Sequence, residues 1–238
     1  MDFTDEEFEE ACSELDNPRI SDYEFFVESS GVQIYRKYQE DSGLYEYKVF
    51  GTLSGVGPET CAKVYVDLEY RKTWDSYVNK LYKVKDGDRE GVYWRVNYPF
   101  PMSSRDYAFI RESREFEIND EHVWVILGRS VPFASKPPVA GVIRVDDFKQ
   151  SMAIKASGDG SKAFMHYYDN PKGMIPTWLV NWAAKVSHFF YCDQIVFRNK
   201  NFINSCSFCV GKCTINQLKF AYTAISISTC LFLVNIFG

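Results

Sequence analysis

Two side chains at helical spacing, Arg71 and Asp75, form the clearest pair of opposite charges in the sequence. Residues four apart on a helix face each other, so a helix across this stretch places the guanidinium beside the carboxylate. On an exposed helix such a pair stabilises the fold by only about 0.3–0.5 kcal/mol. Inside a cavity, the same pair presents an oriented guanidinium to an anion such as a phosphate diester. Spacing alone leaves both interpretations open.

Histidines that could support catalysis are few and badly placed. The sequence has three, His122, His166 and His188, and none stands in the spacing of a zinc protease. No nucleophile elbow, phosphate-binding loop or dinucleotide fingerprint is present. The stretch 157–161 is rich in Gly and Ser, but it resembles a hairpin turn because no helix opens after it. These features predict binding rather than enzymatic catalysis, and they call for no cofactor.

Cysteines are concentrated near the C-terminus. Cys206, Cys209 and Cys213 have a spacing that resembles a metal site. A structural zinc site needs four ligands, and the nearest further candidates, His188 and Cys192, stand at irregular distances. We therefore expect no metal.

Charge divides the chain into two parts. Residues 1–185 hold 31 acidic and 23 basic side chains, a balance of −8, whereas residues 186–238 hold one and four, a balance of +3. An acidic body argues against a nucleic-acid partner. The acidic N-terminus lacks the apolar stretch of a signal peptide, which favours the cytosol. There, Cys12 and Cys61 should be free thiols.

Hydrophobic periodicity predicts an α+β domain. Thr4 and Glu7 have capping-box spacing, so a helix should run from there to about Leu15. A second helix is predicted from Pro58 to Leu68, and a third from 175 onward. Between them, β-rich runs cover residues 31–38, 45–49, 92–96, 106–112, 122–127, 142–148, 152–156 and 163–168. Strands this closely spaced favour an antiparallel meander.

Several blocks of sequence carry a family resemblance. They are residues 45–51 (YEYKVFG), 70–75 (YRKTWD), 98–107 (YPFPMSSRDY), 141–145 (GVIRV) and 175–185 (IPTWLVNWAAK). In this order they resemble the START (StAR-related lipid transfer) family, and most closely its phosphatidylcholine-binding members, over nearly all of residues 1–185. The resemblance implies a helix-grip fold, in which a curved antiparallel sheet wraps a lipid cavity and a C-terminal helix covers its mouth.

The resemblance also implies a function and a set of site residues. It predicts a cytosolic, non-enzymatic carrier that binds one phosphatidylcholine and contacts membranes transiently. Arg71 would bind the lipid phosphate and Asp75 would hold Arg71, while Trp94, Tyr107 and Phe148 would form an aromatic cage around the choline. Phe148 stands where a relative carries Tyr, so we expect a somewhat weaker cage. Without the resemblance, the three aromatic residues would be interpreted as strand residues in the core.

The family pattern ends at Lys185. Residues 186–192 show no helical stripe and the composition shifts there, so we expect the lid helix to be truncated and residues 186–238 to lie outside the domain. One hypothesis is translation of a retained intron or a mispredicted exon. The alternative is a tail anchor, because residues 220–238 carry no charge over about the length of a bilayer span. That alternative would make the protein a membrane-attached START lipid sensor or tether.

Overall fold

Strands dominate the computed structural model, which describes residues 2–29, 31–98 and 100–173. The helices are α1 (Asp5–Glu14), α2 (Pro58–Val66) and α3 (Leu68–Trp74). The strands are β1 (Glu24–Ser29), β2 (Val32–Gln39), β3 (Leu44–Leu53), β4 (Val78–Asp86), β5 (Arg89–Val96), β6 (Arg105–Ile118), β7 (Glu121–Ser130), β8 (Ile143–Val145), β9 (Phe148–Ser157) and β10 (Gly160–Asp169).

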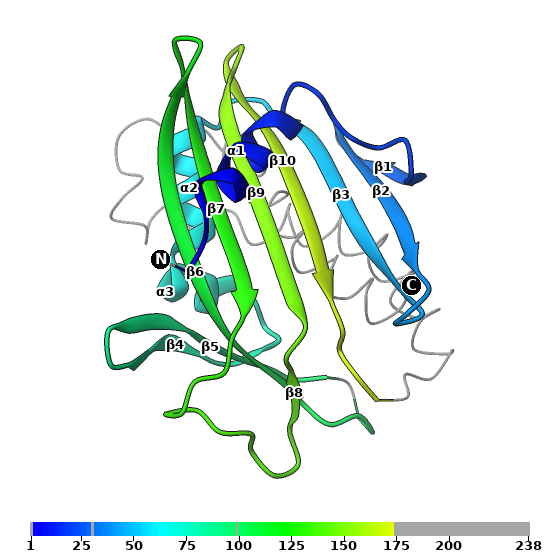
Figure 1. Cartoon of the computed structure of the whole chain (residues 1–238), viewed down its shortest axis with the longest axis vertical. Coiled ribbons are helices and arrows are strands. Elements are labelled where there is room, and N and C mark those ends of the chain that lie inside the picture. The colour runs from blue at the N-terminus through cyan, green and yellow to red at the C-terminus, as the bar shows by residue number, and fades with distance from the viewer. Residues whose placement is uncertain (1, 30, 99, 174–238) are drawn as a thin grey trace.

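Within this part of the chain the strands form one curved sheet (Figure 1). Its order is β1-β2-β3-β10-β9-β7-β6-β5-β4, an open path with β1 and β4 at its two ends. Neighbours along this path are antiparallel, whereas β8 lies off the path and pairs with β6 in parallel. The predicted α+β class with an antiparallel sheet is thus confirmed. The pairing of β3 with β10 joins two strands that are neighbours in the sheet but far apart in the sequence.

Alternating side chains give this sheet two buried faces. On β9, Met152 and Ile154 belong to one hydrophobic cluster, and Ala153 between them belongs to the other. The first cluster includes Cys61 and other residues of α2, and the second includes Phe8 and other residues of α1. The two helices therefore cover opposite faces, and Figure 1 shows α1 in front of β7 and β9. We call the α2 side the inner face and the α1 side the outer face.

The N-terminal helix begins as the sequence predicts. Thr4 Oγ1 accepts a hydrogen bond from the backbone N–H of Glu7, and Glu7 Oε2 accepts one from the N–H of Thr4 at 2.8 Å. This reciprocal capping box satisfies two N–H groups that have no partner within the helix. It also fixes the start of the stripe that buries Phe8, Ala11 and Leu15.

Three features of the fold differ from the sequence prediction. The helix predicted over 58–68 ends at Val66, and Asp67 adopts an extended conformation and caps α3 through Tyr70 N–H at 2.9 Å. The predicted run 142–148 is split, because β8 pairs with β6 whereas β9, which runs in the same direction, begins only at Phe148 and pairs with β7. Strands β1 and β4 were missed, since each carries a bulge that interrupts its alternation.

The predicted tail, residues 186–238, lies outside the described residues, as do the helix predicted from 175, the cysteine cluster and the uncharged segment 220–238. Across residues 2–29, 31–98 and 100–173, no helix combines the length and the apolar composition needed to cross a bilayer.

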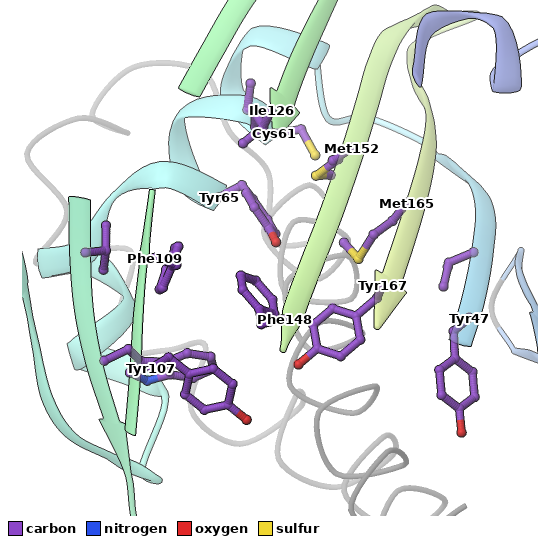
Figure 2. Packing of buried hydrophobic residues seen from close by; sticks show 14 of the residues in the cluster. Tyr47, Cys61, Tyr65, Tyr107, Phe109, Ile126, Phe148, Met152, Met165 and Tyr167 are labelled. Carbon is purple, nitrogen blue, oxygen red and sulfur yellow. The ribbon is translucent and has the colours of Figure 1, made fainter. Parts of the chain in front are cut away.

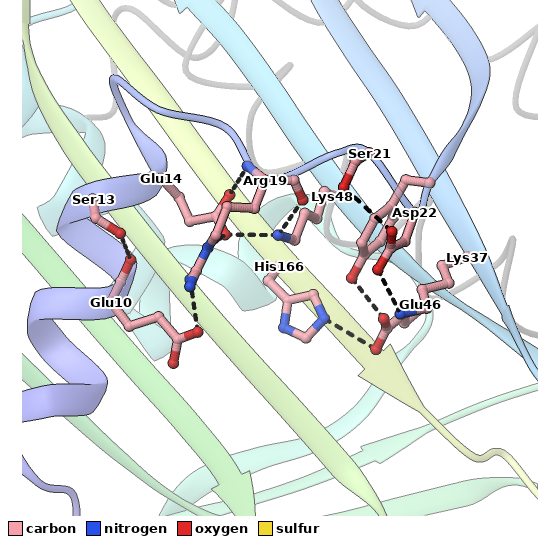
Figure 3. Close-up of polar contacts among 11 residues, drawn as sticks. Glu10, Ser13, Glu14, Arg19, Ser21, Asp22, Lys37, Glu46, Lys48 and His166 are labelled. Atoms are coloured by element: carbon pink, nitrogen blue, oxygen red, sulfur yellow. Dashed lines mark hydrogen bonds and ion pairs between the residues drawn. The ribbon is translucent and has the colours of Figure 1, made fainter.

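A buried ionic clamp joins α1 to β3 on the outer face (Figure 3). Glu14, only 2% exposed, accepts hydrogen bonds from Lys48 Nζ at 2.7 Å and from Arg19 Nε at 2.8 Å. Lys48 Nζ also donates to the carbonyl oxygen of Arg19 at 2.8 Å. Burial alone would raise the pKa of Glu14, but the bonds from Lys48 and Arg19 outweigh it and lower that pKa.

This clamp generates a stability prediction. Replacing Glu14 by Gln should lower the free energy of unfolding at pH 7 by about 3–5 kcal/mol, because buried Lys48 loses its carboxylate. Since the pKa of Glu14 is lower in the folded protein, its contribution is complete above the ordinary value of 4.5 and is lost as pH falls through the folded value. Urea unfolding at pH 7 and at steps down to pH 4 measures both effects.

The matched control is Glu10→Gln, which removes the exposed partner of the same Arg19. That variant should change the free energy of unfolding by less than about 0.5 kcal/mol. Equal effects of the two substitutions would contradict a special role for the buried clamp.

Candidate functional site

A cavity lies on the inner face of the sheet, beside α2 and α3. In this structure its volume is only about 30 Å³, and two arginines, Arg71 and Arg111, contribute to its wall. The aromatic part of the wall consists of Tyr65, Trp94, Phe109, Phe148 and Tyr167. Figure 2 shows the rings of Tyr107, Phe148 and Tyr167 gathered around one space, with Cys61 and Met152 towards the other end of the cluster. The cavity wall therefore combines two guanidinium groups and aromatic rings with aliphatic side chains, and the wider apolar cluster lies behind it.

The Arg71–Asp75 pair is buried at the cavity wall and is not an exposed helical ion pair. Arg71 lies in α3 and Asp75 is the C-cap residue of that helix, with 3.2 Å between Arg71 Nε and Asp75 Oδ2. The side chain of Arg71 is 12% exposed and that of Asp75 is 0% exposed. Asp75 Oδ1 also accepts a hydrogen bond from Tyr77 N–H at 3.1 Å. A carboxylate fixed at both oxygens holds the guanidinium in one orientation at the cavity wall.

Strand register brings Trp94 and Tyr107 together. They are directly opposed on β5 and β6, and their rings stack with centroids 5.1 Å apart and an interplanar angle of 30°. The guanidinium carbon of Arg71 lies 4.4 Å from the centroid of the Trp94 ring. The predicted phosphate and choline residues therefore touch each other at Trp94.

Phe148 completes the aromatic cluster from the other side. As the first residue of β9, it meets Tyr107 edge to face at 5.9 Å, and it also contacts Phe109 at 5.2 Å and Tyr167 at 5.8 Å. All five residues predicted for the site, Arg71, Asp75, Trp94, Tyr107 and Phe148, thus lie in one connected group. Their roles towards a ligand remain predictions.

A buried carboxylate beside this cluster was missed in the sequence. Asp169, the last residue of β10, is 0% exposed and accepts a hydrogen bond from the hydroxyl of Tyr107 at 2.6 Å. Burial raises the pKa of Tyr107 well above its ordinary value, and the charge of Asp169 adds to this. A sequence signal existed, because Asp169 follows Tyr167 by two residues and so faces the same side of a strand.

Two further polar side chains of the wall were also missed. Arg111 donates to the carbonyl oxygen of Val66 at 2.6 Å, and burial lowers the pKa of Arg111 to about 10, with the charge of Arg71 contributing. Gln150 Nε2 is buried and has no hydrogen-bond partner within the described part of the chain. Gln150 follows Phe148 by two positions on β9, and Arg111 follows Phe109, which contacts Phe148, by two positions on β6. The alternation of side chains along a strand could therefore have found both residues.

The Ser-x-Arg-Asp block has a structural role at the end of the sheet. Arg105 donates to the carbonyl oxygens of Ser103, Pro171 and Lys172, at 2.7, 3.2 and 2.9 Å, and so ties the start of β6 to the segment after β10. On the outer face, the adjacent Asp106 accepts bonds from Arg144. Arg105 therefore fixes the end of β6 that carries Tyr107.

Titratable groups elsewhere show no assembled reactive site in residues 2–29, 31–98 and 100–173. His122 contacts Glu115 and Glu117 at 2.8 and 2.7 Å, and His166 contacts Glu46 at 3.4 Å. Neither histidine belongs to the cavity wall. The same residues contain no group of three His, Cys, Asp or Glu side chains that could hold a metal ion.

Comparison with known proteins identifies relatives that share most of this chain. The phosphatidylcholine transfer proteins of Mus musculus and Homo sapiens are each 48% identical to it over 186 residues, which is 77% of this chain and 87% of theirs. The structure of human StAR-related lipid transfer protein 5 superposes with a TM-score of 0.61 at 14% identity, over 77% of this chain and 88% of that one, so it supports the fold alone.

A family model described as the START domain matches residues 8–202. The match runs past Lys185, so the domain boundary predicted there stays a prediction. The curved, open antiparallel sheet, the helices on its two faces and the inner cavity agree with this match. On these grounds the chain belongs to the START domain family.

Proposed function

We propose that this chain is a cytosolic carrier that binds one phosphatidylcholine and transfers it between membranes without chemical conversion. Relatives that are 48% identical over most of their length carry the name phosphatidylcholine transfer protein. The observation that carries the proposal is the buried Arg71–Asp75 pair in contact with the Trp94–Tyr107–Phe148 cluster on the cavity face. A phosphate and a choline are adjacent in the lipid headgroup, as these two groups of residues are adjacent here.

Arg71 is proposed as the phosphate ligand. A guanidinium carries five N–H donors in a planar fork, and the contact with Asp75 uses Nε. The fork suits the two oxygens of a phosphate diester, and burial strengthens each charged bond. Arg111 places a second positive charge in the same wall, and Gln150 adds a buried amide donor that suits a phosphate or ester oxygen.

The aromatic cluster is proposed as the choline site. A quaternary ammonium has no N–H to donate, so a protein binds it with aromatic faces, each worth about 0.5–2 kcal/mol when water is excluded. An ammonium sandwiched between two rings needs each centroid within about 6 Å of the cation. The Trp94 and Tyr107 rings are stacked with their centroids only 5.1 Å apart, which leaves no room for a trimethylammonium group between them. The rings must therefore separate if the choline is to lie between their faces. Binding therefore includes a side-chain rearrangement.

The apolar end of the cavity is proposed for the acyl chains. Ile126 belongs to the cavity wall there, and Cys61 and Met152 are buried behind it, away from Tyr107 (Figure 2). Burying a methylene gains about 0.8 kcal/mol relative to water, but a bilayer offers nearly the same gain. The headgroup contacts must therefore select the lipid. We further propose that residues 1–185 form the lipid-binding domain and that 186–238 lie outside it.

Transfer of fluorescent phosphatidylcholine between vesicles tests the carrier function. We expect the 238-residue chain to transfer this lipid severalfold faster than labelled phosphatidylethanolamine, which has the same phosphate but no methylated ammonium. Equal transfer of the two lipids would contradict choline selection. If neither lipid moves, the same assay on a chain whose residues 186–238 are replaced by a relative's lid helix decides whether the tail or the proposed function is at fault.

The phosphate role of Arg71 is separable from its role in folding. Arg71→Gln leaves Asp75 buried without its partner and should cost about 3–5 kcal/mol of unfolding free energy. The double variant Arg71→Gln, Asp75→Asn should recover most of that stability, because replacing both members of a buried pair is often neutral. Its phosphatidylcholine transfer should still fall by about tenfold or more, as expected for loss of a charged hydrogen bond.

Urea unfolding and vesicle transfer, measured on both variants, give the two readouts. A double variant that transfers phosphatidylcholine at the wild-type rate would remove Arg71 from the phosphate site.

The cage role of Phe148 is tested by a substitution that keeps an apolar side chain. Phe148→Leu should weaken phosphatidylcholine binding by about twofold to thirtyfold, the worth of one aromatic face. The control is Phe164→Leu, which removes a buried ring from the outer-face cluster under α1. Binding to vesicles of graded choline-lipid content should separate the two, since only the cavity variant should lose preference for choline over ethanolamine. The same loss in both variants would indicate general loosening.

A further inference from the structure

Asp169 occupies a distinctive place at the edge of the aromatic cluster. It is the cross-strand partner of Phe148 in the β9–β10 register, and its carboxylate accepts the hydroxyl hydrogen of Tyr107 at 2.6 Å. The residue is 0% exposed. Two of the three rings proposed for choline binding therefore adjoin this carboxylate, one through a hydrogen bond and one through strand pairing.

The phenols around Asp169 remain neutral at physiological pH. Burial raises the pKa values of Tyr98, Tyr107 and Tyr167 well above the ordinary range, and the charge of Asp169 raises each of them further. A hydrogen bond to a carboxylate also makes a phenol ring more electron-rich, which strengthens the attraction of its face for a cation.

The charges of the cavity have two poles. Arg71 and Arg111 contribute positive charge at the wall, and Asp169 contributes negative charge beyond Tyr107. Tyr167 lies within electrostatic reach of both poles, because Asp169 raises its pKa and Arg71 lowers it. A zwitterionic headgroup has the same two charges in the same order, phosphate and then ammonium.

We propose, on the basis of the phosphatidylcholine function above, that Asp169 is a positioning residue that determines headgroup specificity. Its carboxylate orients Tyr107 by the hydroxyl and supplies the negative pole that attracts the quaternary ammonium. It also disfavours phospholipids whose headgroup carries no cation, such as phosphatidylglycerol, because their uncharged glycerol leaves the buried carboxylate without a cation beside it.

The test compares Asp169→Asn with the wild-type chain for binding to vesicles of phosphatidylcholine and of phosphatidylglycerol. Asn keeps the size and an oxygen that accepts the Tyr107 hydroxyl, so the substitution removes mainly charge. The preference for phosphatidylcholine over phosphatidylglycerol should fall by about fivefold to tenfold, the size of a partly screened charge interaction. An unchanged preference in the variant would overturn the role of Asp169.

The matched control is Asp106→Asn. Asp106 is also 0% exposed and accepts a tyrosine hydroxyl, that of Tyr93 at 2.9 Å, but it lies on the outer face. It should leave the lipid preference within about twofold of the wild type, whatever it costs in stability. An equal shift in both variants would indicate a general effect of losing a buried carboxylate and would overturn the proposal.

A second variant keeps the proposal testable if Asp169→Asn does not fold. Tyr107→Phe retains the ring and the carboxylate but removes the hydrogen bond between them, so it should lower the preference for the choline lipid by about threefold. An unchanged preference would overturn the positioning role. The wild-type chain reports on the underlying function separately: if it shows no preference for phosphatidylcholine, the carrier proposal fails before Asp169 is tested.

Discussion

Burial of ionic groups inside an apolar cavity is the constraint on which the inner face depends. A guanidinium taken out of water costs several kcal/mol unless a carboxylate and further hydrogen bonds compensate it. Arg71 meets this requirement through Asp75, whose second oxygen is fixed by the backbone N–H of Tyr77. Asp67 ends α2 and caps α3, and this short helix carries Arg71 and ends at Asp75, so the two side chains meet. Trp94 then packs against a guanidinium whose position is already set.

The outer face also contains a buried ion pair, but there it holds the sheet in its curved shape. The sheet is an open path of strands, so its curvature must be held by what packs on either side. On the outer side, α1 buries an apolar stripe, and Glu14 at its end binds Lys48 of β3. At the far end of the sheet, Arg105 ties β6 to the segment that follows β10. These contacts, which are not part of the cavity wall, therefore fix the positions of the strands that form the wall.

Local sequence patterns predicted most of the helices and strands. They did not separate α2 from α3, or β8 from β9. The capping box of Thr4 and the alternation in β3, β5 and β10 are short-range signals, and they led to correct elements. The break at Asp67 was not predicted, because the apolar stripe continues through it to Leu68 and only the backbone turn separates the helices. Tertiary pairing decides such cases, since β8 pairs with β6 whereas β9 pairs with β7.

The site residues show the same limit in a sharper form. Spacing predicted that Arg71 and Asp75 would meet, but it could not decide whether they were buried. The family resemblance, rather than any periodicity in the sequence, grouped Arg71 and Asp75 with Trp94, Tyr107 and Phe148. Residues that only three-dimensional pairing reveals were missed, and Asp169 is the clearest example because it reaches Tyr107 across 62 positions of sequence.

Selectivity in this fold must arise at the end of the cavity where charge is buried. Acyl chains gain about as much in a bilayer as in a protein, so they supply affinity against water and little discrimination between phospholipids. Charged groups behave in the opposite way, because membrane water solvates a headgroup well and the cavity does so only where fixed charges match it. Because Asp75 pairs with Arg71, the charges that remain are one guanidinium, that of Arg111, and one carboxylate, that of Asp169 behind Tyr107, and this pair of opposite charges suits the proposed zwitterionic headgroup. The same desolvation that makes these groups costly to bury therefore makes them selective.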